Sequence, residues 1–94
     1  MRKRGRIDSI QPQVCAALRR AGCSVLVMSN LGGGAPDLLV RRQGDFWLME
    51  LKDGNLPPSK RRLTPDEKAF HDEWQCGRLV IVGSIEEAFK AVGL

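Results

Sequence analysis

The chain has 94 residues, of which 43% are hydrophobic and 28% are charged, a composition typical of one small globular domain with a modest core. No apolar run approaches the ~20 residues that span a bilayer, and the basic stretch at 1–7 leads into no apolar segment, which argues against a membrane helix and a secretory signal. We therefore expect a cytoplasmic protein in which 1–94 form a single domain behind a basic tail at 1–7.

The formal net charge is +4, and the basic residues are clustered along the chain. Such clusters attract polyanions, among which nucleic acid is the usual partner and anionic membrane the less usual one. Short basic runs are also common on solvated surfaces, so charge favours a nucleic-acid partner without deciding the matter. The clusters are Arg2-Lys3-Arg4-Arg6, Arg19-Arg20, Arg41-Arg42 and Lys60-Arg61-Arg62.

Three cysteines form an odd count without the spacing of a paired metal or redox motif. Small thiols of this kind are common in protein interiors. The sequence therefore predicts that Cys15, Cys23 and Cys76 are reduced residues in or near the core.

The spacing of apolar residues predicts seven elements in the order αβββαβα. Asp8 or Ser9 is expected to cap the first helix and Gly22 to end it, whereas Thr64 and Glu67 form a capping box at the second. The connection between the third and fourth strands is long enough for a right-handed crossover, which gives an α/β fold with a mixed central sheet and helices on both faces. The elements are a helix at 10–21, strands at 24–29, 37–43 and 46–52, a helix at 65–75, a strand at 78–83 and a helix at 85–92.

The second and third strands are expected to form a tight β-hairpin around a two-residue turn, Gly44-Asp45. That turn places Asp37 directly opposite Lys52. Because side chains alternate between the faces of a sheet, Glu50 shares the face of Lys52, and Asp37 joins them from across the ladder. Two carboxylates and one ammonium thus converge at one end of an otherwise apolar sheet.

This charged cluster has two interpretations. Neighbouring carboxylates repel unless a cation joins them, and Mg²⁺ prefers two carboxylates together with water and phosphate oxygens. Lys52 would then orient or deprotonate a water, or stabilise charge on a phosphorane-like transition state. In the alternative, Lys52 neutralises Asp37 in a structural ion pair and Glu50 lies at the solvent edge. Spacing alone favours neither interpretation.

A family resemblance favours the first interpretation. Pro36-Asp37, twelve intervening residues and Glu50-Leu51-Lys52 resemble the PD-(D/E)XK nuclease signature. The glycine-rich approach at 33–38 and the Leu-Thr-Pro-Asp-Glu stretch at 63–67 are similar to the VRR-NUC clade of that superfamily. The similarity continues to 84–88 and covers nearly the whole chain. It implies the restriction-endonuclease-like αβββαβα core of that family.

The resemblance also implies a Mg²⁺- or Mn²⁺-dependent DNA endonuclease. Asp37, Glu50 and the backbone carbonyl of Leu51 would hold the metal, and Lys52 would position the attacking water. Members of the family usually add a glutamate from the first helix, and Asp8 is the nearest acidic residue here, either as its substitute or as a helix cap. Stand-alone members resemble Holliday-junction resolvases, which implies branched or flapped DNA as the substrate and a homodimer as the active form.

Two further groups are expected to touch nucleic acid. Lys60, Arg61 and Arg62 begin eight residues after Lys52 and would contact phosphates without reading sequence, unless they are only a solvated loop. Gly33 and Gly34 would let the backbone approach a phosphate closely.

Two other functions remain open at this point. In the first alternative to a structure-selective endonuclease, the chain is a non-catalytic basic nucleic-acid-binding domain whose charged cluster is structural. In the second, it is a sequence-specific restriction-type nuclease. Trp47 and Trp74 would stack on bases in a binding role. Their apolar neighbours at strand and helical spacing favour core packing for both.

Overall fold

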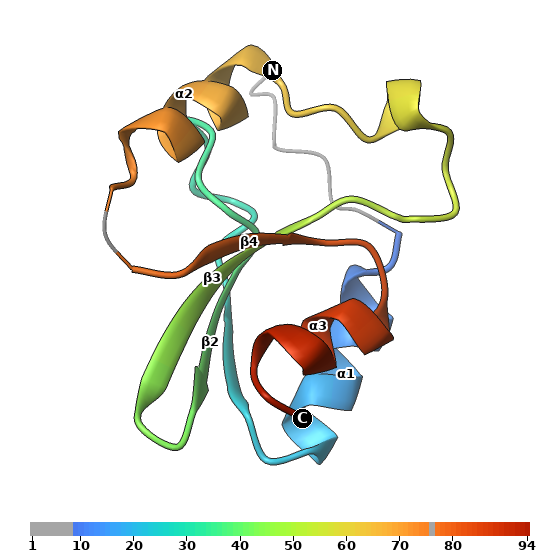
Figure 1. The fold of residues 1–94 in the computed structure, drawn as a ribbon, viewed down its shortest axis with the longest axis vertical. Coiled ribbons are helices and arrows are strands. Elements are labelled where there is room, and N and C mark those ends of the chain that lie inside the picture. Colours follow the sequence, from blue (N-terminus) through green and yellow to red (C-terminus); the bar gives the residue numbers. More distant parts are fainter. Residues whose placement is uncertain (1–8, 76) are drawn as a thin grey trace.

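The computed structural model describes residues 9–75 and 77–94. Asp8, the basic tail at 1–7 and Cys76 lie outside the described residues, so the predictions made for them stay predictions. The predicted order of elements is confirmed, with one short 3₁₀ turn added (Figure 1). In chain order the elements are α1 (Gln11–Arg20), β1 (Ser24–Val27), β2 (Leu38–Arg42), β3 (Asp45–Leu51), η1 (Pro58–Lys60), α2 (Pro65–Glu73), β4 (Leu79–Val82) and α3 (Ile85–Ala91).

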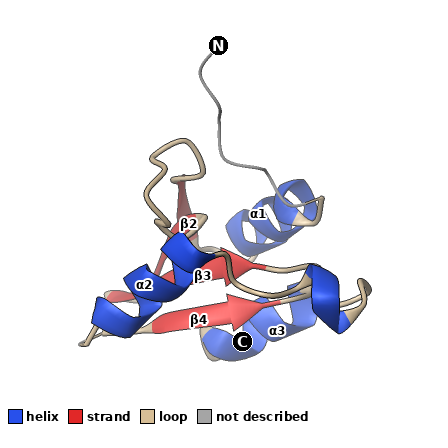
Figure 2. Cartoon of the chain, turned by 90° about the horizontal axis from the view of Figure 1, so that it is seen from above, coloured by secondary structure: helices blue, strands red, loops and turns tan. Residues whose placement is uncertain are grey.

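The four strands form one mixed sheet in the order β1-β2-β3-β4. The first two pairs are antiparallel, whereas β3 and β4 are parallel and are joined through α2. Helices α1 and α3 pack against each other on one side of the sheet, and α2 lies on the other side (Figure 2). None of the helices in the described ranges is long and apolar enough to cross a membrane.

The core lies between the sheet and the pair of helices α1 and α3. Alternate strand residues point into it, as the period of a strand requires, and the four in the central strands are almost fully buried. Cys15 and Cys23 are buried free thiols, as predicted. The four central-strand residues are Leu38, Val40, Met49 and Leu51.

The hairpin turn consists of Gln43 and Gly44, so the predicted turn Gly44-Asp45 is wrong by one residue. Both turn residues have positive φ, 52° and 87°, as the favoured two-residue hairpin turn requires, and glycine suits the second position. Asp45 instead enters β3 opposite Arg42. The pairing therefore shifts by two residues, and its continuation from β2 places Asp37 beside Glu50 rather than opposite Lys52. An even shift leaves every side chain on its predicted face.

The start of α1 also differs from the prediction. The helix begins at Gln11, and the N-cap position belongs to Ile10, whose apolar side chain offers no capping oxygen. Ser9 does not cap the helix; its hydroxyl donates instead to Asp53 Oδ2 at 3.4 Å.

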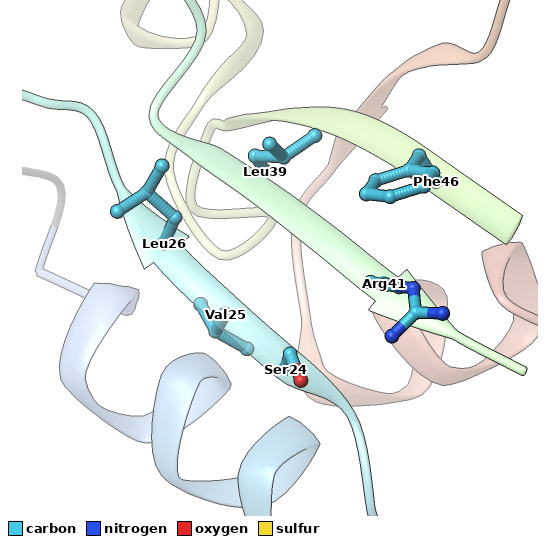
Figure 3. Close-up of a pocket in the computed structure, with 6 residues that line it drawn as sticks. All are labelled: Ser24, Val25, Leu26, Leu39, Arg41 and Phe46. Carbon is cyan, nitrogen blue, oxygen red and sulfur yellow. The ribbon is translucent and has the colours of Figure 1, made fainter. Parts of the chain in front are cut away.

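Helix α2 packs only loosely over the other face of the sheet, since none of its nine residues is buried. Leu26 and Phe46 on this face are 57% and 52% exposed. They line a hollow of about 190 Å³ with Ser24, Val25, Leu39 and Arg41 (Figure 3).

Trp74 closes a second hollow, of about 310 Å³, on the same sheet face. Core packing was predicted for this residue and is wrong, since its side chain is 45% exposed. Trp74 is the C-cap residue of α2 and stacks on Phe70, one turn earlier, with ring centroids 5.2 Å apart, but none of the residues of α2 is buried. Trp47, by contrast, is buried as predicted.

Candidate active site

The three charged residues predicted to converge do lie together, where β3 ends. Asp37 directly precedes β2, Glu50 is the penultimate residue of β3, and Lys52 follows that strand. Asp37 and Glu50 are buried, with exposed fractions of 8% and 2%. The Leu51 N–H donates to Asp37 Oδ2 at 2.8 Å, and Lys52 Nζ lies 3.9 Å from Glu50 Oε2.

The electrostatics of the two buried carboxyls favour binding of a positive charge. Burial, reinforced by the Asp37 and Glu67 carboxylates, raises the pKa of Glu50 to about 9. Burial also raises the pKa of Asp37, although the hydrogen bond from the Leu51 N–H acts against it. At neutral pH the pair therefore retains a proton unless a cation takes its place.

The chemistry of the donors fits a small divalent cation. Glu50 Oε1 is buried and has no hydrogen-bond partner among the described residues, so one lone-pair site faces inward unused. Within 9–75 and 77–94, no three His, Cys, Asp or Glu side chains are grouped so as to hold a metal. The predicted set instead contains two carboxylates and the Leu51 carbonyl, all oxygen donors of the kind that Mg²⁺ uses together with water and substrate oxygens.

A buried amide lies next to this site, and the sequence did not predict it. Gln11, in the first turn of α1, is buried and accepts a hydrogen bond from Ser29 Oγ at 2.9 Å. The chain beside Ser29 contacts the site directly, because the Met28 N–H donates to the backbone carbonyl of Asp37 at 2.7 Å. The sequence did contain an indication of this burial: Gln11 lies on the same helix face as the apolar residues Val14 and Leu18.

Glu67 is the second site residue that sequence reasoning missed. Its capping box with Thr64 is confirmed: the Glu67 N–H donates to Thr64 Oγ1 at 3.2 Å, and the Thr64 N–H donates to Glu67 Oε1 at 2.9 Å. The same Oε1 accepts a hydrogen bond from Lys52 Nζ at 2.8 Å. Burial pushes the pKa of Glu67 upward, but the hydrogen bonds from Lys52 and Thr64 outweigh it, and the pKa is lowered. Lys52 is thus bound to the first turn of α2.

The residues predicted to contact nucleic acid lie on two loops. Lys60, Arg61 and Arg62 are exposed, at the end of η1 and just after it, on the connection between β3 and α2. Gly33 is exposed with open space around it, whereas Gly34 packs against the start of α2. Gly34 therefore has a packing role that was not predicted from the sequence.

We expect Gly34→Ala to lower the free energy of unfolding by about 2–5 kcal/mol. Gly34 has a φ of +82°, where a Cβ costs about 1–2 kcal/mol, and that Cβ would collide with the backbone of Asp66 and Glu67, at a further cost of about 1–3 kcal/mol. Urea unfolding measures the loss. Gly33→Ala is the matched control, since its φ is +66° but no atom lies near its Cβ. Equal losses in the two variants would contradict the tight contact with α2.

A solved structure described as a VRR_NUC domain matches this chain with a TM-score of 0.65. The two share 28% sequence identity, over 88% of this chain and 89% of the other. This match supports the resemblance to the VRR-NUC family. No family model matches, and the comparison with curated proteins gives no match.

The restriction-endonuclease-like α/β core expected from the resemblance is thereby confirmed. The match to a VRR_NUC domain suggests a nuclease-type function. The residues of the signature, Asp37, Glu50 and Lys52, lie together at the end of the hairpin, and Glu67 joins them from α2 through its hydrogen bond with Lys52. Gln11 contacts Ser29 on the neighbouring segment.

Proposed function

We propose that the chain is a metal-dependent DNA endonuclease that hydrolyses phosphodiester bonds at the cluster of Asp37, Glu50 and Lys52. The observation that carries this proposal is the buried, unpartnered Oε1 of Glu50 beside a second buried carboxyl. A purely structural ion pair does not account for it, because Lys52 hydrogen-bonds to Glu67 and leaves Glu50 at 3.9 Å. The match to a VRR_NUC domain supports a nuclease reaction.

Each residue of the cluster has a distinct role in this proposal. Asp37, Glu50 and the Leu51 carbonyl would hold Mg²⁺ or Mn²⁺, which when bound supplies Lewis-acid polarisation of the scissile phosphate. The Leu51 N–H fixes the orientation of Asp37 through its 2.8 Å hydrogen bond. The Lys52 ammonium orients the attacking water and stabilises the negative charge that develops on the phosphate oxygens.

The proposed substrate is DNA, bound through phosphate contacts. The exposed side chains of Lys60, Arg61 and Arg62 extend from the connection that leaves the site strand, where they are available to a backbone lying across the site. Such contacts weaken steeply with salt and read no sequence. Branched or flapped DNA is the proposed class, in keeping with the resemblance to Holliday-junction resolvases.

A cleavage assay tests this function. The protein is incubated with junction, flap and linear duplex DNA in Mg²⁺ or Mn²⁺, with a chelator in parallel. Metal-dependent nicking of branched substrates is the expected result. Cutting of linear duplex only at a short sequence would favour the restriction-type alternative. Binding without cleavage of any substrate would favour the non-catalytic binding domain and contradict the proposal.

We further propose a homodimer, because a junction requires two symmetric cuts. The surface that supports it is the open sheet face with its apolar hollows around Leu26, Leu39 and Phe46 (Figure 3). An exposed apolar patch of this kind commonly marks an interface.

Phe46→Glu is expected to convert the dimer to a monomer, since it places a carboxylate in the centre of this patch. Light scattering after size exclusion measures the mass of wild type and variant. Leu56→Glu, at another exposed leucine in the loop that follows β3, serves as the control and leaves the mass unchanged. A wild-type protein that stays monomeric at every concentration tested would contradict the dimer.

A further inference from the structure

Lys52 lies between two carboxylates but is bonded to one of them. Its Nζ is 2.8 Å from Glu67 Oε1, within hydrogen-bond distance, and 3.9 Å from Glu50 Oε2, beyond it. The Lys52 and Glu67 side chains are largely shielded from water, and Glu50 is almost completely buried. The Lys52 ammonium is thus hydrogen-bonded to the less buried Glu67 and not to the more deeply buried Glu50.

Without Glu67, the carboxyl group within ion-pair distance of Lys52 among the described residues is that of Glu50. The buried Glu50 carboxyl has an oxygen with no hydrogen-bond partner among the described residues, and where water is scarce it would attract the Lys52 ammonium as it would any other cation. A rotation of the flexible lysine side chain would close the remaining gap. The resulting ion pair would supply at Glu50 the positive charge that a divalent cation would otherwise supply.

Glu67 is well suited to prevent this collapse because its own position is fixed. The capping box holds both its backbone N–H and its carboxylate at the first turn of α2. The close packing of Gly34 against the backbone of Asp66 and Glu67 fixes that turn against the glycine loop.

We propose that Glu67 is a positioning residue that holds Lys52 away from Glu50 and so keeps the Glu50 carboxylate open to a divalent cation. This inference rests on the proposed function, since it concerns the same metal site. It gives the capping glutamate of α2 a role in cation binding, although Glu67 is not proposed as a ligand.

The test measures Mn²⁺ affinity by calorimetric titration of the intact chain without DNA. Glu67→Ala is expected to weaken binding roughly tenfold, the low end of what loss of an outer-sphere partner costs. In a Lys52→Met background the same Glu67→Ala change is expected to have no effect, because no ammonium remains to occupy Glu50. Equal weakening in both backgrounds would mean that Glu67 acts only through its own negative charge, and would overturn the inference.

Two further variants separate positioning from charge and from helix stability. Glu67→Gln retains an acceptor oxygen for Lys52 and is expected to keep most of the affinity; a loss as large as that of Glu67→Ala overturns the inference. Thr64→Ala removes the hydroxyl cap from the Glu67 N–H but leaves the bond between Lys52 and Glu67, and is expected to bind Mn²⁺ as wild type does. Weakening equal to that of Glu67→Ala would assign the effect to fraying of α2 and also overturn it.

Failure of this inference is distinguishable from failure of the proposed function. A wild-type chain that binds no Mn²⁺ overturns both. A wild-type chain that binds Mn²⁺ with the same affinity as its Glu67→Ala variant overturns the positioning role alone and leaves the metal site in place.

Discussion

Asp37→Asn and Lys52→Ala are each expected to reduce metal-dependent DNA cleavage by about 10³-fold while DNA binding is retained. Asn at position 37 keeps an oxygen to accept the Leu51 N–H, so the loop geometry survives, but it lacks the negative charge that a cation requires. Lys52→Ala removes the ammonium that lies 3.9 Å from Glu50 Oε2. Single-turnover cleavage and a gel-shift titration measure the two quantities separately.

The matched control for Lys52→Ala is Lys68→Ala. Lys68 also forms an ion pair with a carboxylate, Asp72 at 3.0 Å, but on the exposed side of α2. Both variants lose one positive charge, so a non-specific loss of DNA affinity would affect them alike. Cleavage that persists in Asp37→Asn or Lys52→Ala, or an equal loss of cleavage in Lys68→Ala, would contradict the roles assigned to the cluster.

Glu50→Gln is expected to stabilise the metal-free protein at pH 8 by about 5 kcal/mol, since pH 8 lies about 3.5 units above the ordinary pKa of 4.5. The pKa of Glu50 is raised from 4.5 to about 9, so the folded chain holds a proton that the unfolded chain releases. The stability associated with that proton is fully present below pH 4.5 and is lost as the pH rises through about 9, at about 1.4 kcal/mol for each pKa unit. The glutamine side chain does not titrate, so the free energy of unfolding of the variant changes less with pH than that of wild type.

Denaturant unfolding from pH 5 to 9 in the presence of a chelator measures this slope. Addition of Mn²⁺ at pH 8 is expected to raise the stability of wild type, since the cation takes the place of the proton, and to leave Glu50→Gln unchanged. Glu86→Gln, on the exposed face of α3, is the control and retains the wild-type slope. Parallel pH profiles for wild type and Glu50→Gln would contradict the burial-driven shift.

The order of elements was predictable because helical and strand periods are local properties of the chain. The hairpin register was not, because Gly44 fits either position of a two-residue turn, and the backbone angle at Gln43 decides which one it takes. The face assignment survived the error, since any even shift preserves it. The meeting of Asp37 with Glu50 and Lys52 was therefore predicted correctly from an incorrect register.

The remaining site residues were not predictable, because they depend on how distant elements pack. The sequence identified Glu67 as a capping residue, but nothing local indicates that the same oxygen reaches Lys52 across the crossover. Gln11 meets Ser29 only because α1 lies over the end of β1. The helical spacing of Phe70 and Trp74 is present in the structure, but it does not indicate burial, because none of the residues of α2 is buried.

Glu67 Oε1 accepts hydrogen bonds from both Lys52 Nζ and the Thr64 N–H, and the bond to Lys52 helps to hold α2 in place. Helix α2 has nine residues, fewer than the roughly 12–15 that an isolated helix needs in water, and none of them is buried. Its first turn is fastened by the bond to Lys52 and by the contact with Gly34. Lys52 of the charged cluster therefore also stabilises the position of α2, the helix that connects β3 to β4. Replacement of Lys52 would remove one of these two attachments and leave the contact with Gly34 to hold the first turn of α2.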